Sequence, residues 1–137
     1  MKFLIFLSLI LFTSGLSYSC PMIQGSYFCE SETSEFKMNV VQKNVIFRFF
    51  DRNTDVTKIS SFYSDGKLRQ FKNHYSDANF YKSSCRGNVL EIDILETRED
   101  DSIVLRKYSF YREDSGLVIK KIDQDDNEET ILCYPDN

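Results

Sequence analysis

Apolar and polar residues alternate along most of this chain in short runs that are interrupted by turn residues. The clearest run is 90–94, in which Leu90, Ile92 and Ile94 alternate with Glu91 and Asp93. Alternation with a period of two is typical of a β-strand that has one face in a core and the other in water. Similar runs predict further strands in residues 22–29, 36–40, 45–49, 59–63, 68–75, 79–84, 103–111, 117–122 and 130–134.

Turn residues separate these runs at short intervals. Asp65-Gly66 lies between two strand-like runs and is the strongest short signal for a β-hairpin. No segment keeps apolar residues at helical spacing, and no segment is long enough for a crossover between parallel strands. The pattern therefore predicts an all-β, antiparallel meander of nine or ten short strands.

The expected meander has a defined overall architecture. Closing it into a barrel removes its exposed edges, so we expect an up-and-down barrel of eight to ten strands. A two-sheet β-sandwich is the alternative. Because the chain has no linker, internal repeat or low-complexity segment, residues 20–137 are expected to form a single domain.

Residues 1–19 follow a different pattern, which is typical of a secretory signal peptide. Lys2 precedes an uncharged, mostly apolar run over residues 3–12, and the small residues Ser17 and Ser19 suit cleavage before Cys20. The run is shorter than the roughly 20 residues that span a bilayer, and no second run exists. We therefore expect a secreted or periplasmic protein with no transmembrane segment after cleavage. A lipid anchor on Cys20 is the less favoured alternative, because Ser17 stands where such signals usually have Leu.

All four cysteines follow the expected cleavage site, and an even number in an exported domain suggests two disulfides. If residues 22–29 form a strand, Cys20 and Cys29 lie about 30 Å apart at ~3.3 Å per residue. That separation excludes their pairing, because disulfide-bonded Cα atoms lie within ~7 Å. Two pairings remain open, and both join Cys20 and Cys29 to Cys85 and Cys133.

The charge of the chain limits its partners. The sequence has 17 basic and 21 acidic residues and a net charge of −4. Nucleic acids and anionic membranes select clustered Lys and Arg, which this chain lacks. We therefore expect no nucleic-acid partner, and we expect the domain to be a monomer.

The start of the expected mature chain, Cys20 to Cys29, resembles the opening of calycin-type barrels, the lipocalins and avidins. In those families a Gly-x-Trp motif begins the first strand and plugs the closed end of the barrel. Here Gly25 is followed two positions later by Tyr27 in place of Trp. The resemblance implies an eight- to ten-stranded barrel with a lumen for a small apolar ligand.

Aromatic residues are the candidates for the inside of this barrel. They either line a ligand cavity or fill the interior as a packed core, which small barrels also do. In the first case the domain binds a small apolar molecule or a protein surface, and in the second it is a structural or inhibitory interaction module. The candidates are Phe36, Phe47, Phe49, Tyr63, Tyr108 and Phe110.

No motif for catalysis, cofactor binding or metal binding occurs in the sequence. The chain lacks nucleophile-elbow, zinc-protease and phosphate-loop patterns, and His74 is its only histidine. The run from Asp123 to Glu129 begins like a calcium loop, but Glu128 stands where that loop requires Gly. Asp and Asn are common in hairpin turns, which is the simpler interpretation. We therefore predict no enzyme activity, no cofactor and no metal site.

Overall fold

The computed structural model describes residues 20–51 and 61–136. The expected signal peptide, residues 1–19, and the first part of the expected strand at 59–63 lie outside the described residues. The described residues contain no helix that is long and apolar enough to span a membrane.

Ten β-strands make up the secondary structure of the described chain, as the alternating pattern predicts. The strands are β1 (Gly25–Glu30), β2 (Glu35–Lys43), β3 (Ile46–Asp51), β4 (Ser61–Tyr63), β5 (Leu68–Phe71), β6 (Asn79–Arg86), β7 (Val89–Thr97), β8 (Ile103–Glu113), β9 (Gly116–Asp123) and β10 (Glu128–Pro135).

Tight turns join most consecutive strands, and the residues in these turns explain their backbone conformation. Several turns contain a residue with positive φ, a conformation that Asn and Asp tolerate better than other side chains. These residues are Asn44, Asp101, Asp114 and Asp126.

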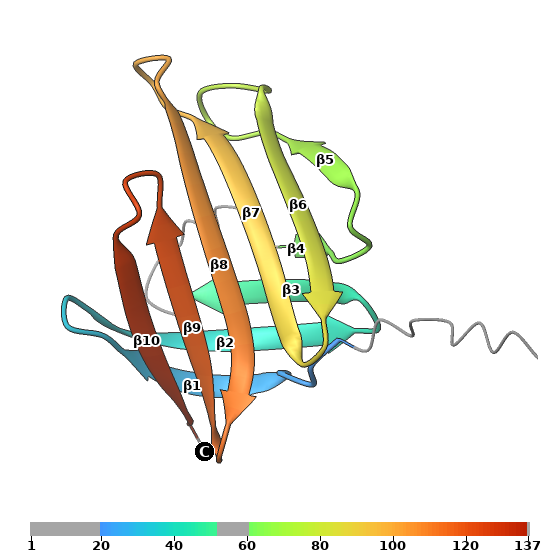
Figure 1. Cartoon of the computed structure of the whole chain (residues 1–137), viewed down its shortest axis with the longest axis vertical. Helices are drawn as coiled ribbons and strands as arrows, with labels where there is room; N and C mark the ends of the chain where they lie inside the picture. The colour runs from blue at the N-terminus through green and yellow to red at the C-terminus, as the bar shows by residue number, and fades with distance from the viewer. Residues whose placement is uncertain (1–19, 52–60, 137) are drawn as a thin grey trace, which may run out of the picture.

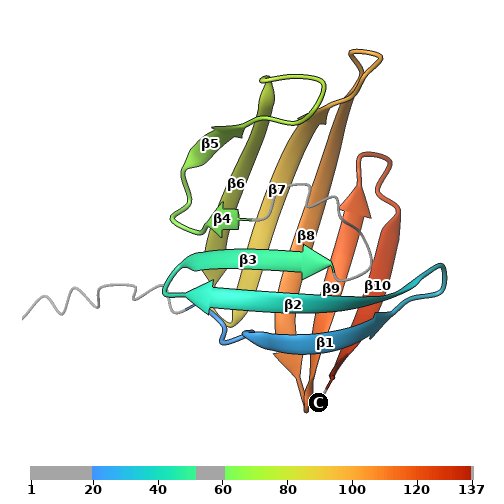
Figure 2. The ribbon, with the colours of Figure 1, turned by 180° about the vertical axis from the view of Figure 1, so that it is seen from behind.

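All ten strands belong to one antiparallel sheet, in the order β4-β3-β2-β1-β10-β9-β8-β7-β6-β5. Neighbouring strands follow one another along the chain, except that β1 pairs with β10. The sheet curls strongly into a half-barrel, so that β1, β2 and β3 cross behind β6 to β9 (Figure 1; Figure 2). The predicted all-β, up-and-down architecture is confirmed.

The open seam of the half-barrel lies between β4 and β6. The Asp65-Gly66 turn crosses this seam, but β4 and β5 are not neighbours in the sheet, so the hairpin expected there does not form. Instead, β5 pairs with β6, and the Gly66 amide donates to the Ser83 carbonyl at 2.8 Å. The turn therefore connects the two edges of the sheet rather than two paired strands.

Polar contacts between side chains also hold the seam together. The hydroxyl groups of Ser64 and Ser83 are buried and lie 2.6 Å apart. The Tyr63 amide donates to the Tyr81 hydroxyl across the same gap, at 3.1 Å. These contacts supply hydrogen bonds that an edge strand otherwise lacks.

The core lies on the concave face of the sheet. Along β6 and β7, buried residues alternate with more exposed ones, as expected for strands with one face in a core. The largest fully buried side chains include Phe47, Ile23, Leu90 and Ile92. The curl of the sheet brings inward-facing side chains of β2 and β3 against those of β7 and β8, which gives one continuous core.

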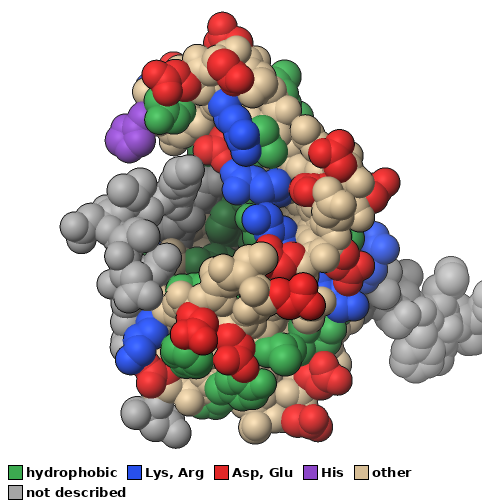
Figure 3. All heavy atoms as spheres, turned by 90° about the vertical axis from the view of Figure 1, so that its left-hand side faces the viewer, with side chains coloured by type: hydrophobic (Ala, Val, Ile, Leu, Met, Phe, Trp, Pro, Cys, Tyr) green, Lys and Arg blue, Asp and Glu red, His purple; other side chains and the backbone are tan. Residues whose placement is uncertain are grey.

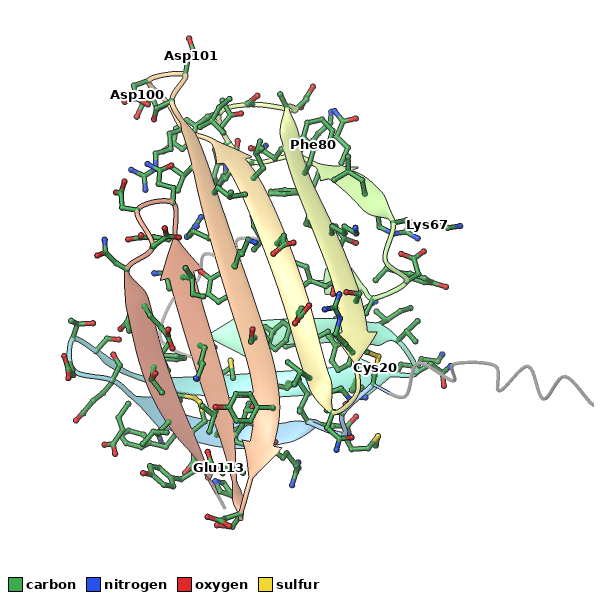
Figure 4. All side chains as sticks on the ribbon, viewed as in Figure 1. Cys20, Lys67, Phe80, Asp100, Asp101 and Glu113 are labelled. Carbon is green, nitrogen blue, oxygen red and sulfur yellow. A yellow bond between two sulfur atoms is a disulfide. The ribbon has the colours of Figure 1, made fainter. Side chains whose placement is uncertain are left out.

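Two disulfides link the strands. Cys29 pairs with Cys133, directly opposite it on the neighbouring strand, and Cys20 pairs with Cys85. Cys20 precedes β1 but lies beside the end of β6 (Figure 4), so this bond joins parts of the sheet that are far apart in strand order. The Cys20–Cys29 pairing that strand length excludes does not occur.

Candidate ligand-binding pocket

A cavity of about 240 Å³ opens on the concave face of the half-barrel. In the space-filling view its floor is hydrophobic, and Lys or Arg side chains lie beside it (Figure 3). Seven strands contribute to its wall, so the cavity is a product of the curl rather than of one loop. The wall consists of Phe36, Met38, Phe49, Phe62, Ile92, Ile94, Glu96, Arg106, Tyr108, Phe110, Ile119 and Ile131.

Aromatic rings form a connected part of this wall. Phe49 stacks on Phe110 with ring centroids 4.8 Å apart, and Tyr108 lies 6.2 Å from Phe110. Phe62 meets Phe49 edge to face at 5.9 Å. Such contacts stabilise the relative positions of the rings beyond their simple burial. The cavity is therefore bounded by rings that hold one another in place.

Four of the six aromatic residues predicted from the sequence line this cavity: Phe36, Phe49, Tyr108 and Phe110. Phe47 faces the same interior but is fully buried in the core and does not line the cavity. The predicted packed core and the predicted cavity thus coexist, in different parts of the concave face.

The expected inward position of Tyr63 is wrong. Tyr63 is 39% exposed, and its neighbour Phe62 is the residue of β4 that packs into the core. Tyr63 instead lies under the guanidinium group of Arg69, 4.4 Å from the ring centroid. It borders a second hollow of about 540 Å³ at the seam, which has charged and turn residues in its wall, including Asp65 and Lys82.

One ion pair, which sequence reasoning missed, lies in the wall of the apolar cavity. Arg106 on β8 donates through Nη2 to the Glu96 carboxylate on β7. The Arg106 side chain is 25% exposed and that of Glu96 is 12% exposed. Glu96 lies two positions after Ile94 and Arg106 lies two positions before Tyr108, so both belong to the inward-facing, mostly apolar side of their strands. A charged residue at such a position was the only feature of the sequence that could have indicated this ion pair.

Hydrogen bonds from the β5–β6 loop hold Glu96 in position. The Asn73 side-chain amide donates to Glu96 at 3.4 Å and to the Thr97 carbonyl at 2.9 Å. Asn79, which is fully buried, accepts from the Thr97 amide at 2.7 Å and from Asn73 at 3.3 Å. The carboxylate that faces Arg106 is thus fixed by a network of neutral donors and acceptors.

The acidic run after β9 forms a self-contained turn. The Asp123 carboxylate accepts hydrogen bonds from the amides of Asp125 and Asn127 and from the Asn127 side chain. These bonds, led by the one from the Asn127 side chain, lower the pKa of Asp123.

Among the described residues, no group of three or more His, Cys, Asp or Glu side chains is arranged to hold a metal ion. His74 is exposed in the β5–β6 loop.

Comparisons of the chain with protein-family models, with curated proteins and with solved structures give no match. The lipocalin-like relationship expected from the opening sequence stays a prediction.

Proposed function

We propose that this protein is an exported, disulfide-stabilised binding protein that takes a small, mainly apolar molecule into the pocket of the half-barrel. The observation that carries this proposal is the 240 Å³ cavity with an almost wholly apolar wall. Binding sites for small molecules are typically concave, mostly apolar and provided with a few polar groups. The pocket has this composition, with Glu96 and Arg106 as the only charged side chains among the described residues of its wall.

The size of the pocket limits the ligand. Pockets for drug-sized ligands measure roughly 300 to 1,000 Å³, and this one is smaller. A single aromatic ring or a short branched chain suits it better than a lipid or a polycyclic compound.

Two disulfides support the proposed location outside the cytoplasm. Disulfides persist in oxidising compartments such as the extracellular space and the bacterial periplasm. All four cysteines are in these bonds. A secreted or periplasmic protein of this kind meets small molecules before they reach the cell interior.

The alternative of a solid-core interaction module has less support. Its interior would be filled by side chains, whereas the described residues leave a cavity on the concave face. Exposed apolar residues such as Leu132 and Tyr134, which are two positions apart on β10, occur on the convex face. A few exposed apolar side chains are normal on protein surfaces and do not by themselves favour a protein partner.

Binding of ethylbenzene, measured by ligand-observed NMR, tests the proposal. A cavity-filling variant, Ile94→Phe, is expected to weaken binding at least about tenfold, because the added ring occupies the ligand volume. The matched control is Leu95→Phe, at the next position of β7, which is not in the cavity wall and should bind as the unchanged protein does. Equal binding by both variants, or no binding by the unchanged protein, contradicts the proposal.

A further inference from the structure

Val118 is buried, although it does not belong to the core. Leu117, Val118 and Ile119 are consecutive in β9, and all three are buried. Leu117 and Ile119 are part of the continuous core on the concave face, whereas Val118 is not. Successive side chains of a strand point to opposite faces of the sheet, so Val118 lies on the convex face. Apolar side chains outside the core therefore cover it.

The strand register identifies these side chains. Tyr111 on β8 and Leu132 on β10 lie directly opposite Val118. On β7, Val89 lies opposite Tyr111, and Tyr134, two positions after Leu132, has an aromatic residue of β1 opposite it. Side chains directly opposite each other in an antiparallel sheet lie close enough for contact. The resulting outer band crosses five strands and consists of Phe28, Val89, Tyr111, Val118, Leu132 and Tyr134.

One end of the outer band is exposed and hollowed. Leu132 is 41% exposed and Tyr134 is 46% exposed, and a hollow of about 330 Å³ lies beside them. Gly116 is in its wall, where an added Cβ would lie 2.7 Å from the Cys133 carbonyl oxygen, so this position cannot carry a side chain. Contiguous apolar surface differs in this respect from single exposed residues, because it is typical of interaction sites. A hollow within it can take an anchoring side chain of a partner.

The charges around the hollow select the partner. Glu113 and Asp114, both exposed, are the only charged residues in the part of its wall that the structure describes. Glu113 lies at the end of β8, near the C-terminal end of β10 (Figure 4). Neither carboxylate forms an ion pair with another described residue. Glu30 adds a third carboxylate, directly opposite Leu132. A cationic group next to an apolar one is therefore complementary to this surface.

A second copy of this chain is not complementary to the outer band. In a dimer with two-fold symmetry the same patch of both copies meets itself. Glu113 and Asp114 of one copy would then approach the acidic surface of the other, and like charges brought together at an interface are unfavourable.

We propose that the outer band docks a segment of another protein that presents an Arg or Lys side chain next to an apolar one. The apolar side chain packs on Leu132 and Tyr134, and the cation lies against Glu113 and Asp114. The outer band and the apolar cavity are on opposite faces of the sheet, so this role goes beyond the proposed function and does not depend on it. A bound small molecule and a docked protein do not compete for space.

Two synthetic peptides with the cores Leu-Arg-Leu and Leu-Glu-Leu, capped at both ends, test the proposal. Titrated into ¹⁵N-labelled protein, the Leu-Arg-Leu peptide should shift the backbone amide resonances of residues 113–118 and 132–134. It should bind about tenfold more tightly than Leu-Glu-Leu, because attraction to the carboxylates replaces repulsion. High salt should reduce this preference by screening the exposed charges. A third peptide, Ser-Arg-Ser, should bind more weakly than Leu-Arg-Leu because it lacks apolar side chains.

A charge variant separates the carboxylates from the fold. Glu113→Gln/Asp114→Asn should bind the Leu-Arg-Leu and Leu-Glu-Leu peptides alike. Asn is used because Asp114 has a φ of 52°, a conformation that Asn tolerates. The matched control, Asp125→Asn/Asp126→Asn, removes two charges from the turn at the other end of β9, where Asp126 also has a positive φ. It should keep the preference of the unchanged protein.

A second pair of variants tests the apolar contact. Leu132→Ser should weaken binding of Leu-Arg-Leu about fivefold, because part of the apolar contact area is lost. Leu105→Ser is the matched control, since Leu105 is 40% exposed and lies on the same convex face, on β8 and outside the outer band. It should bind the peptide as the unchanged protein does.

The opposite results are equally clear. Absence of binding, equal binding of Leu-Arg-Leu and Leu-Glu-Leu, or equal binding of Leu-Arg-Leu and Ser-Arg-Ser overturns the proposal. A preference for Arg that survives in Glu113→Gln/Asp114→Asn also overturns it. Shifts of the same resonances that grow with protein concentration in the absence of peptide would identify a second copy as the occupant instead. Ethylbenzene binding is measured separately, so none of these outcomes decides the proposed function.

Discussion

At the scale of single residues, the Glu129 carboxylate connects two parts of the sheet. It accepts hydrogen bonds from the hydroxyl groups of Ser31, at 2.7 Å, and Thr33, at 2.9 Å, in the turn between β1 and β2. These bonds lower the pKa of Glu129, the one from Ser31 most, because they stabilise the ionised form. Glu129 thereby joins the start of β10 to the β1–β2 turn.

The lowered pKa predicts how Glu129 affects stability as the pH changes. A group whose pKa is lower in the folded state stabilises the fold above its ordinary pKa, and this stabilisation is lost as the pH falls through the lowered value. Near neutral pH, Glu129→Gln should therefore reduce the free energy of unfolding by about 1 kcal/mol. At acid pH, below the lowered pKa, the difference between the two proteins should shrink.

Urea unfolding at several pH values measures this effect. The matched control is Glu128→Gln, because the carboxylate of Glu128 is exposed and pairs with Lys120 at 3.5 Å. Surface pairs of this kind contribute little, so this variant should change stability by less than ~0.5 kcal/mol. A deficit of Glu129→Gln that stays constant down to acid pH would show that the hydrogen bonds do not favour the ionised carboxylate.

The direction in which a side chain points could be predicted from the sequence only in long, regular strands. Alternation over β8 places Tyr108 and Phe110 on the same face, and both line the cavity. In β4, two aromatic residues are adjacent within three positions, so alternation alone does not tell whether Phe62 or Tyr63 faces inward. Arg106 interrupts an apolar face, and its partner Glu96 becomes visible only when the register of β7 and β8 is known.

At the scale of elements, the seam is the weakest part of the sheet. β4 has three residues and pairs with a neighbouring strand on one side only, namely β3. On its other side, the Ser64–Ser83 hydroxyl pair and the bond from the Tyr63 amide to Tyr81 replace a strand ladder. The position of β4, and with it that of Phe62 in the cavity wall, depends on these few contacts.

The Ser64–Ser83 pair predicts a non-additive effect of mutation. Ser83→Ala leaves the buried Ser64 hydroxyl without its partner, which should reduce the free energy of unfolding by about 1 to 3 kcal/mol. The double variant Ser64→Ala/Ser83→Ala removes both groups, so it should cost less than the sum of the two single variants. Ser84→Ala, at the next position of β6, which faces the opposite side of the sheet, is the control.

Denaturant unfolding of all four variants gives the coupling energy. Additive costs for the two single variants would mean that the hydroxyl groups do not interact, and that something other than this pair holds β4 at the seam. The sequence could not predict this contact. It predicts a hairpin from Asp65-Gly66, because a local turn signal does not reveal that β5 pairs with β6 instead.

At the scale of the whole molecule, the two disulfides have different positions relative to the sheet. Cys29–Cys133 joins β1 and β10, which are already paired by backbone hydrogen bonds. Cys20–Cys85 joins the segment before β1 to the end of β6, and four strands lie between β1 and β6 in the sheet order. The sequence excluded one pairing through strand length, but the choice between the other two depends on how the sheet curls.

This difference predicts that the disulfides affect stability alike but affect the pocket differently. The bonds span 65 and 104 residues of sequence, and the entropy of loop closure gives a loss of about 4 to 5 kcal/mol for removing either one. Of the two bonds, only Cys20–Cys85 links parts of the sheet that are far apart in strand order, so only this bond restrains the curl that brings Phe36 and Phe49 opposite β8. Cys20→Ala/Cys85→Ala should therefore also weaken ethylbenzene binding roughly tenfold, through loss of preorganisation.

Ethylbenzene titrations by NMR, in buffer where both double variants remain folded, test this difference. Cys29→Ala/Cys133→Ala should keep the affinity of the unchanged protein, because the ladder between β1 and β10 still holds those strands in register. An equal loss of affinity in both variants would mean that the pocket responds to overall stability and not to the curl. Unchanged affinity in both would mean that the core alone sets the shape of the pocket, since the side chains of β3 and β8 then hold the two halves together without the covalent link.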